Sequence, residues 1–234
     1  MKLLKRVILF LGFFSQFVLA DNIIVNGTRF IYSENDKEIT VQLNNTANRP
    51  AVAQIWLDEG DPKALPETIK TPFQIMPPIS KLSAGGGQTI RIKLIDKAQL
   101  PTDKETLYWL NLLDIPPITK AEKNAEQNML QLAIRSRFKF MYRPNKLGSR
   151  ELAPEKLQIL GGRGSLQIKN PTPFFITVTT VNTQSSTLNL EGFMLSPNET
   201  KTIKIRGTVS VGEYLTINNI NDYGAEVPAK IKVQ

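Results

Sequence analysis

The stretch that decides the fold, residues 128–144, reads NMLQLAIRSRFKFMYRP. Apolar side chains alternate with others in its first part, which places Leu130, Leu132 and Ile134 on one face of an extended chain. This alternation predicts a β-strand with one apolar side, and from the pattern alone an ordinary core strand is the simplest interpretation. The run spans about 15 residues, more than the usual strand of roughly 5 to 6, so we expect part of it to extend beyond the core of its own sheet.

Similar short runs recur along the chain between residues that favour turns. The expected strands lie at 38–43, 51–57, 89–94, 107–113, 166–169, 174–181, 200–206 and 213–217. No stretch shows the pattern of an amphipathic helix. Short strands at regular spacing, separated by Pro, Gly and Asn, predict an all-β protein built of sandwiches.

A polar, turn-rich stretch at 145–150 separates two groups of expected strands. We therefore expect an N-terminal domain at 21–144, a linker at 145–150 and a C-terminal domain at 151–234. Domains of this size can each bury a core of their own. The residues at 76–79 include two consecutive prolines, which cannot donate to a continuous strand ladder.

The first 20 residues have the composition of a signal peptide. Three basic residues lie within 2–6, an apolar run follows at 7–14, and the segment ends in Ala20. A membrane anchor is the alternative, but the apolar run is short and the polar Asp21 follows directly. We expect 1–20 to be cleaved off and the remaining chain to be exported.

The chain contains neither histidine nor cysteine, which excludes His-assisted triads, thiol nucleophiles and the ordinary zinc sites. Asp58, Glu59 and Asp61 cluster beside glycine and proline, where a turn explains them without an acid–base pair. The glycines fit no phosphate-binding motif, and Lys and Arg are spread along the chain although the formal net charge is +8. We expect no enzymatic activity, no cofactor, no metal site and no nucleic-acid partner.

Several motifs in order resemble one known family, the periplasmic pilus-assembly chaperones of the chaperone–usher pathway. The matching runs are GTRFIY at 27–32, YWLNLLDIPP at 108–117, LQLAI at 130–134, FKFMYRP at 138–144, NPTPFF at 170–175, MLSP at 194–197 and INDYG at 220–224. The resemblance covers nearly all of residues 21–234. It implies two immunoglobulin-like β-sandwich domains in an L- or boomerang-shaped arrangement, with a subunit-binding cleft between them.

The resemblance also implies a function and a location. Pilus subunits of this system are immunoglobulin-like domains without their last strand, so each exposes a groove that would aggregate if uncovered. The chaperone lends a strand to that groove, which is donor-strand complementation, and delivers the subunit to the outer-membrane usher in the periplasm of a Gram-negative bacterium. The side chains that match the donated ones are Met129, Leu130, Leu132 and Ile134.

Two cations match the basic pair with which the family anchors the C-terminal carboxylate of the subunit, namely Arg29 and Lys139. Such a pair suits the task because charge-assisted hydrogen bonds are strong. Outside the motif, each would be interpreted as a solvated residue on a strand. Lys139 also has the opposite parity from Leu132, and a bulge or a twist between Ile134 and Lys139 would reconcile the two.

A charged trio, Glu105, Arg143 and Asp222, matches the residues that bridge the two domains in the family. With Arg143 between two carboxylates, its expected role is to orient the domains. The chain departs from some family members in having no disulfide, and its connection at 118–128 resembles the branch of the family with a short loop.

Two other classes of protein remain as alternatives. The chain could be a structural pilus subunit or adhesin, although those are usually single incomplete domains. It could also be an exported carbohydrate-binding β-sandwich, which would expose aromatic side chains in a groove. Trp56 and Trp109 instead lie in apolar strand-like runs, where core packing is the simpler expectation.

An unoccupied donor strand could also pair with a second copy of the chain.

Overall fold

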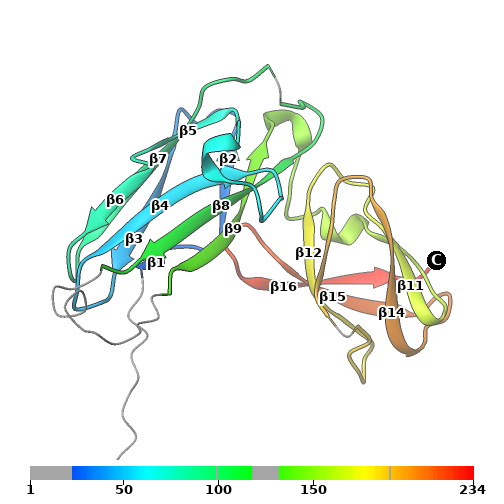
Figure 1. The fold of residues 1–234 in the computed structure, drawn as a ribbon. Helices are drawn as coiled ribbons and strands as arrows, with labels where there is room; N and C mark the ends of the chain where they lie inside the picture. Colours follow the sequence, from blue (N-terminus) through cyan, green and yellow to red (C-terminus); the bar gives the residue numbers. More distant parts are fainter. Residues whose placement is uncertain (1–22, 99, 118–131, 190) are drawn as a thin grey trace, which may run out of the picture.

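The computed structural model describes residues 23–98, 100–117, 132–189 and 191–234, which form two β-sandwiches set at an angle to each other (Figure 1). The all-β, two-sandwich fold class expected from the sequence is therefore confirmed. The only helices in the described part of the chain are three short 3₁₀ turns, η1 (Pro66–Thr68), η2 (Asn145–Leu147) and η3 (Pro154–Lys156). No helix among these residues has the length and hydropathy needed to cross a membrane.

The first sandwich consists of two sheets. One has the order β1-β3-β7-β5 and contains β1 (Ile23–Val25), β3 (Ile39–Asn45), β7 (Gly87–Leu94) and β5 (Phe73–Met76). The other has the order β2-β9-β8-β4-β6 and contains β2 (Arg29–Ser33), β9 (Ile134–Arg143), β8 (Thr106–Ile115), β4 (Ala51–Asp58) and β6 (Ile79–Leu82).

The second sandwich is smaller. Its three-stranded sheet has the order β10-β11-β14 and contains β10 (Gln158–Leu160), β11 (Arg163–Lys169) and β14 (Thr200–Thr208). Its four-stranded sheet has the order β13-β12-β15-β16 and contains β13 (Phe193–Leu195), β12 (Ile176–Asn182), β15 (Tyr214–Ile220) and β16 (Glu226–Lys232). Each sandwich encloses one apolar cluster, so each has a core of its own.

The chain passes from one sheet of the first sandwich to the other immediately after β1. β1 pairs with β3, whereas β2 pairs in parallel with β9. Gly27 lies between the two strands with a φ of 131°, a backbone conformation that side chains other than glycine rarely adopt. This crossing places the start of β2, at Arg29, beside β9.

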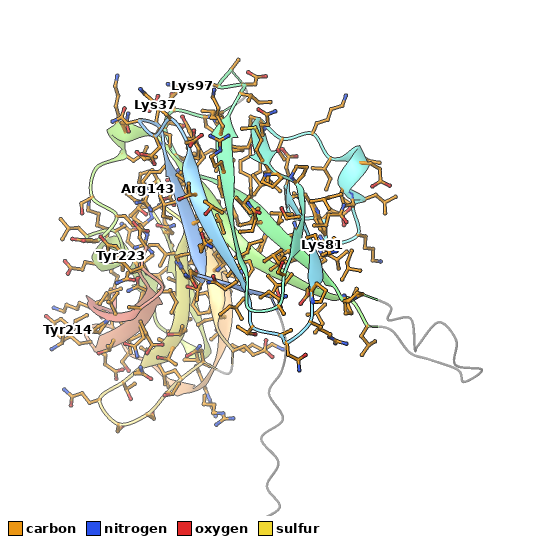
Figure 2. All side chains as sticks on the ribbon, turned by 90° about the vertical axis from the view of Figure 1, so that its left-hand side faces the viewer. Lys37, Lys81, Lys97, Arg143, Tyr214 and Tyr223 are labelled. Carbon is orange, nitrogen blue, oxygen red and sulfur yellow. The ribbon has the colours of Figure 1, made fainter. Side chains whose placement is uncertain are left out.

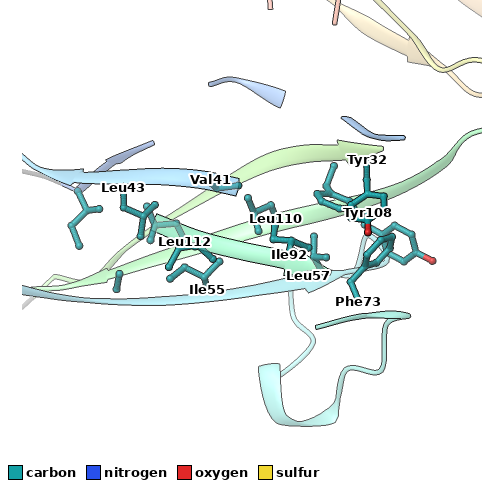
Figure 3. Packing of buried hydrophobic residues seen from close by; sticks show 14 of the residues in the cluster. Tyr32, Val41, Leu43, Ile55, Leu57, Phe73, Ile92, Tyr108, Leu110 and Leu112 are labelled. Carbon is teal, nitrogen blue, oxygen red and sulfur yellow. The ribbon is translucent and has the colours of Figure 1, made fainter. Parts of the chain in front are cut away.

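Aromatic rings dominate one end of the first core (Figure 3). The ring of Phe73 contacts those of Phe140, Tyr32 and Tyr108 at centroid distances of 4.9, 5.3 and 5.3 Å. Strand alternation explains the arrangement, because inward side chains of β2, β8 and β9 meet the inward ring of β5. Edge-on ring contacts of this kind stabilise a core beyond the area that they bury.

All eight strands expected from short apolar runs are present, and so are β9 and, at the run GTRFIY that matches the first strand of the family, β2. Six further strands were missed: β1, β5, β6, β10, β13 and β16. Five of these have only three or four residues, too few to show a periodicity. β16 contains Pro228, which ordinarily argues against a strand, but β16 pairs only with β15 and leaves its other edge free for a residue without an N–H. As expected, the two prolines at 77–78 separate β5 from β6.

The decisive stretch forms β9, and its inward face changes character along its length. Phe140 and Tyr142 are fully buried in the core, whereas Ile134 is 49% exposed and Leu132, just before the strand, is 66% exposed. An ordinary core strand is thus the right interpretation for its end and the wrong one for its beginning. The pairing of β9 with β8 continues without a register shift from Tyr142 to Ile134, so the bulge suggested by the parity of Lys139 does not exist.

The two tryptophans lie outside the apolar core in which they were expected to pack, although Trp56 is buried. Both lie on the outer face of the five-stranded sheet, because Ile55, Leu57, Tyr108 and Leu110 take the inward positions of β4 and β8. Arginine side chains from β9 cover the indole rings there. The error arose because apolar side chains occupy both faces of these strands, so period-two alternation is lost.

Replacing Phe140 with alanine should destabilise the first sandwich by about 3–5 kcal/mol, because it removes the ring at the centre of the aromatic packing. Urea unfolding followed by tryptophan fluorescence measures this, since both tryptophans of the chain lie in that sandwich. The control is Ile95→Ala, an exposed apolar residue whose loss should change stability by less than about 0.5 kcal/mol. Equal midpoints for the two variants would contradict the assignment of Phe140 to the core.

Candidate functional site

The first half of β9 has an open edge. β8 pairs with β9 along its whole length, but β2, on the other side, pairs only with the second half, from Lys139 to Arg143. Within the described ranges, no strand lies against 134–138 on the side away from β8. This segment is called the open edge below. A row of unpaired backbone groups is a template for the addition of a strand.

The sequence-predicted donor residues are only partly within the described chain. Ile134 lies at the start of the open edge and Leu132 lies just before it, and both are exposed. Met129 and Leu130 lie outside the described residues, as does the connection at 118–128 that was compared with the short-loop branch of the family. Exposed apolar side chains beside an open edge are the two features that a donated strand requires.

Arg29 and Lys139 lie side by side where the open edge ends. They are register partners on the parallel strands β2 and β9, and both point away from the core toward the second sandwich. Arg29 Nη1 donates to the carbonyl oxygen of Ile220 at 3.1 Å, and Lys139 Nζ donates to Thr177 Oγ1 at 2.6 Å. The two cations therefore lie in the angle between the sandwiches, about as far apart as neighbouring strands.

The electrostatics of this pair are unfavourable in the absence of an anion. Burial, and then the charge of Arg29, lower the pKa of Lys139 to about 8. Burial and the charge of Arg150 lower the pKa of Arg29, against the opposing effect of the Asp222 and Glu105 carboxylates. Arg29 Nε is buried and has no hydrogen-bond partner among the described residues. The pair thus presents two partly desolvated cations and one spare hydrogen-bond donor.

Glu105, Arg143 and Asp222 lie together across the junction of the sandwiches. Arg143 Nε donates to Glu105 Oε1 at 2.6 Å, and its two terminal nitrogens donate to the Asp222 carboxylate at 2.6 and 2.8 Å. Glu105 is buried in the first sandwich and Asp222 follows β15 in the second. The arginine therefore bonds a carboxylate from each side, with the bidentate geometry that gives strong pairs.

The pKa values of the two carboxyl groups are shifted in opposite directions. Burial raises the pKa of Glu105, although Arg143 and the Phe175 N–H oppose that effect. Burial alone would also raise the pKa of Asp222, but the hydrogen bond from Arg143 and the nearby arginine charges outweigh it and hold the pKa below its ordinary value.

Backbone contacts also hold the two sandwiches together. Glu105 N donates to the carbonyl oxygen of Pro173 at 2.9 Å. Gly224, with a φ of 84°, lies so close to Thr28 that a Cβ at this position would collide with the threonine hydroxyl. In Figure 2 the exposed Tyr223, beside this glycine, lies below Arg143. The junction is thus fixed at several points around the charged trio.

Sequence reasoning missed one cluster entirely. Asp58 was assigned to a turn, and its Oδ1 does accept the turn hydrogen bond from Gly60 N at 2.7 Å. The same carboxylate is buried and also pairs with Arg135 and Arg137 of the open edge. The alternation of arginine with small or apolar residues at 135–139 was the available signal, but its partner on β4 is too distant in sequence to be inferred. The described residues include no group of three or more Asp and Glu side chains that could hold a metal ion.

Arg143→Ala should destabilise the protein by about 3–5 kcal/mol, because Glu105 would be left as a buried carboxylate without its charged partner. The matched control is Arg91→Ala, whose exposed ion pair with Glu38 at 3.8 Å contributes at most about 1 kcal/mol. Thermal unfolding compares the two variants, and small-angle X-ray scattering reports the angle between the sandwiches. An unchanged melting temperature and scattering profile for Arg143→Ala would contradict an orienting role.

Models of two protein families match the chain. The model described as "Pili and flagellar-assembly chaperone, PapD N-terminal domain" matches residues 22–148, and that described as "Pili assembly chaperone PapD, C-terminal domain" matches residues 152–231. Chaperone protein MrkB of Klebsiella pneumoniae is 56% identical over 99% of this chain and 100% of its own length.

Solved structures agree with this result. The CupB2 chaperone of Pseudomonas aeruginosa is 30% identical, with a TM-score of 0.76 over 90% of this chain and all of its own. A structure of the Salmonella enterica SafA pilin in complex with the SafB chaperone contains a chain that is 25% identical, with a TM-score of 0.76 over 92% of this chain and 98% of its own. These likenesses exclude the carbohydrate-binding and pilus-subunit alternatives. The chain belongs to the PapD family of pilus-assembly chaperones, whose role is not enzymatic.

Proposed function

We propose that this chaperone binds pilus subunits by donor-strand complementation and delivers them to the outer-membrane usher. The observation that carries the proposal is the open edge of β9, which ends at the Arg29–Lys139 pair. The related SafB forms a complex with a pilin, which supports a pilus subunit as the partner of this chain.

The geometry of the open edge determines how a partner strand would lie. A strand added beside 134–138 is collinear with β2 and meets the start of β2 at Arg29, so it has to end there. If its C-terminal carboxylate lies at that end, the strand runs in the same direction as β9. Main-chain hydrogen bonds to the open edge then provide affinity, and the carboxylate receives charge-assisted bonds from Arg29 and Lys139.

Apolar side chains of the donor segment would fill the groove of the subunit. Leu132 and Ile134 have inward parity but lie beyond the buried part of the core, so they are free to enter a partner. Met129 and Leu130 extend the same segment, and Leu130 has the same parity as Leu132. Burying an apolar side chain of this size contributes roughly 1.5–3 kcal/mol.

The proposed function also implies a location for the protein and a role for each of its domains. We place this activity in the periplasm, after removal of 1–20 as a signal peptide, because the basic and apolar pattern of that segment is typical of exported proteins. The N-terminal domain at 21–144 would supply the donor strand, 145–150 would link it to the C-terminal domain at 151–234, and the charged trio would set their angle. A second copy of the chain would compete for the same open edge.

Arg29→Ala and Lys139→Ala should each lower recovery of a pilus subunit, because each removes charge-assisted bonds of roughly 1.5 to 3 kcal/mol, about ten- to a hundredfold in affinity. The test is periplasmic co-expression with the pilus subunit encoded beside the chaperone gene, followed by purification of a one-to-one complex. A wild-type chaperone that rescues the subunit from degradation, with both folded variants failing, is the expected result.

Two exposed cations outside the site serve as matched controls. Arg91 lies on β7 in the other sheet, and Lys81 lies on β6 at the far edge of the same sheet as Lys139 (Figure 2). Arg91→Ala and Lys81→Ala should recover as much subunit as the wild type. Equal recovery for the cleft variants and the controls would refute the carboxylate anchor, and no recovery with the wild type would refute the proposed function.

Subunit binding should weaken as the pH rises through about 8. The pKa of Lys139 in the free chaperone lies at about 8 because of burial and the Arg29 charge, and a bound carboxylate would raise it again. Binding then takes up a proton above pH 8, so affinity is highest below that pH and falls as the pH increases. Binding measurements from pH 7 to pH 9.5 check this. Lys139→Arg, which stays charged, should remove most of the dependence, and an equal dependence in that variant would contradict the prediction.

A further inference from the structure

A polar cluster on the outer face of the five-stranded sheet has no part in the core, the cation pair or the interdomain trio. It consists of Asp58 at the end of β4, Asn111 on β8, and Arg135 and Arg137 on β9, and is called the Asp58 cluster below. Asp58 and Asn111 are almost completely buried although they face away from the core. Burying a carboxylate and an amide is costly unless both are fully bonded.

The hydrogen bonds of the cluster satisfy both groups. The two Asp58 oxygens accept from Arg137 Nη2 at 2.6 Å and from Arg135 Nη2 at 3.3 Å. Asn111 Nδ2 donates to Asp58 Oδ2 at 2.7 Å. Asn111 Oδ1 accepts from Arg135 Nε and Nη2 at 2.9 and 2.7 Å and from Arg137 Nε at 3.1 Å. Each guanidinium is thus held by two different strands.

Indole rings support the same two guanidinium groups. Arg135 lies over Trp56 with its Cζ 4.7 Å from the ring centroid, and Arg137 lies over Trp109 at 4.8 Å. Arg135 Nη1 also donates to the carbonyl oxygen of Pro62 at 2.6 Å. Stacking and bonding together fix both arginine side chains in one position.

Both arginines belong to the open edge, so the contacts of the cluster act directly on the conformation of that segment. On the inward face of that segment Phe138 packs against the core, but Ile134 at the other end is half exposed, so the core anchors only the end nearer Lys139. On one flank it has β8, and on the other it has no strand within the described ranges. The outward side chains of Arg135 and Arg137 therefore add side-chain contacts beyond the β8 ladder that hold the segment extended.

We propose that the Asp58 cluster is a positioning device that keeps the open edge in strand geometry before a subunit arrives. This inference rests on the proposed function, in which that edge receives the subunit strand. A segment that is already ordered has less conformational entropy to lose when the partner binds. The four side chains of the cluster would then aid capture through the order of the segment, without contacting the subunit themselves.

Hydrogen exchange of the free chaperone tests the ordering. In Asp58→Asn the two guanidiniums lose their charged acceptor, and amides of 134–138 that bond to β8 should exchange about tenfold faster. Amides of 140–142 on the same strand, paired on both sides, should keep their rates. Arg135→Gln, a milder change at a partly exposed side chain, should give a smaller increase at the same amides. Arg91→Gln, on the other sheet, should give none.

Recovery of the complex tests the consequence for capture. With the pilus subunit encoded beside the chaperone gene as the probe, both cluster variants should recover several-fold less complex than the wild type, while Arg91→Gln recovers the same amount. Unchanged exchange at 134–138 in the folded variants would overturn the inference. Faster exchange spread evenly over the first sandwich would also overturn it, since that indicates a role in overall stability alone.

The two proposals can fail separately. If the wild type recovers subunit but the cluster variants recover it equally well despite faster exchange at 134–138, the positioning role is wrong and the proposed function stands. If the wild type recovers no subunit, the proposed function fails, and the role in capture fails with it. The exchange comparison uses the free protein and decides the ordering of the segment in either case.

Discussion

The pairing of β9 with its two neighbours is the constraint on which the rest of the structure depends. β8 accompanies β9 along its whole length in one unbroken register, but β2 begins only at Arg29 and covers only the second half. One strand is therefore a central core strand at one end and an edge at the other. Phe140 and Tyr142 at the first of these ends are fully buried, whereas Ile134 at the other is half exposed.

The junction between the sandwiches depends on β9 as well. Outward side chains from successive odd positions include the arginines of the Asp58 cluster, then Lys139 beside Arg29, and finally Arg143 in the charged trio. A single face of a single strand thus connects the open edge, the cation pair and the second sandwich. Replacing the trio with apolar residues could stabilise the fold, since buried ion pairs rarely exceed their desolvation cost. We propose that the trio instead orients the two sandwiches, because an arginine fork between two carboxylates allows few relative orientations.

Sequence reasoning predicted the fold, and named side chains that the fold brings together, for identifiable reasons. Alternating runs predicted eight strands that are present, whereas strands of three or four residues give no periodicity, and Pro228 argued against β16. Motif resemblance brought Glu105, Arg143 and Asp222 together although 38 and 79 positions separate them in sequence. The tryptophans were misplaced because β4 and β8 carry bulky side chains on both faces. The Asp58 cluster was invisible because its bonds join β4, β8 and β9, and no local pattern encodes contacts between strands so distant in sequence.

If a partner strand ends at Arg29, the distance in sequence from its C-terminus determines where each of its residues lies along the open edge. Side chains of an added strand alternate between the two faces, so each position relative to the chaperone would depend on the number of residues from the terminal carboxylate. A partner with one residue more or fewer at its C-terminus would present the wrong face to the chaperone throughout its length. The cation pair would then set the register of the partner strand. The chaperone would tolerate substitutions in that strand far better than insertions or deletions near its C-terminus.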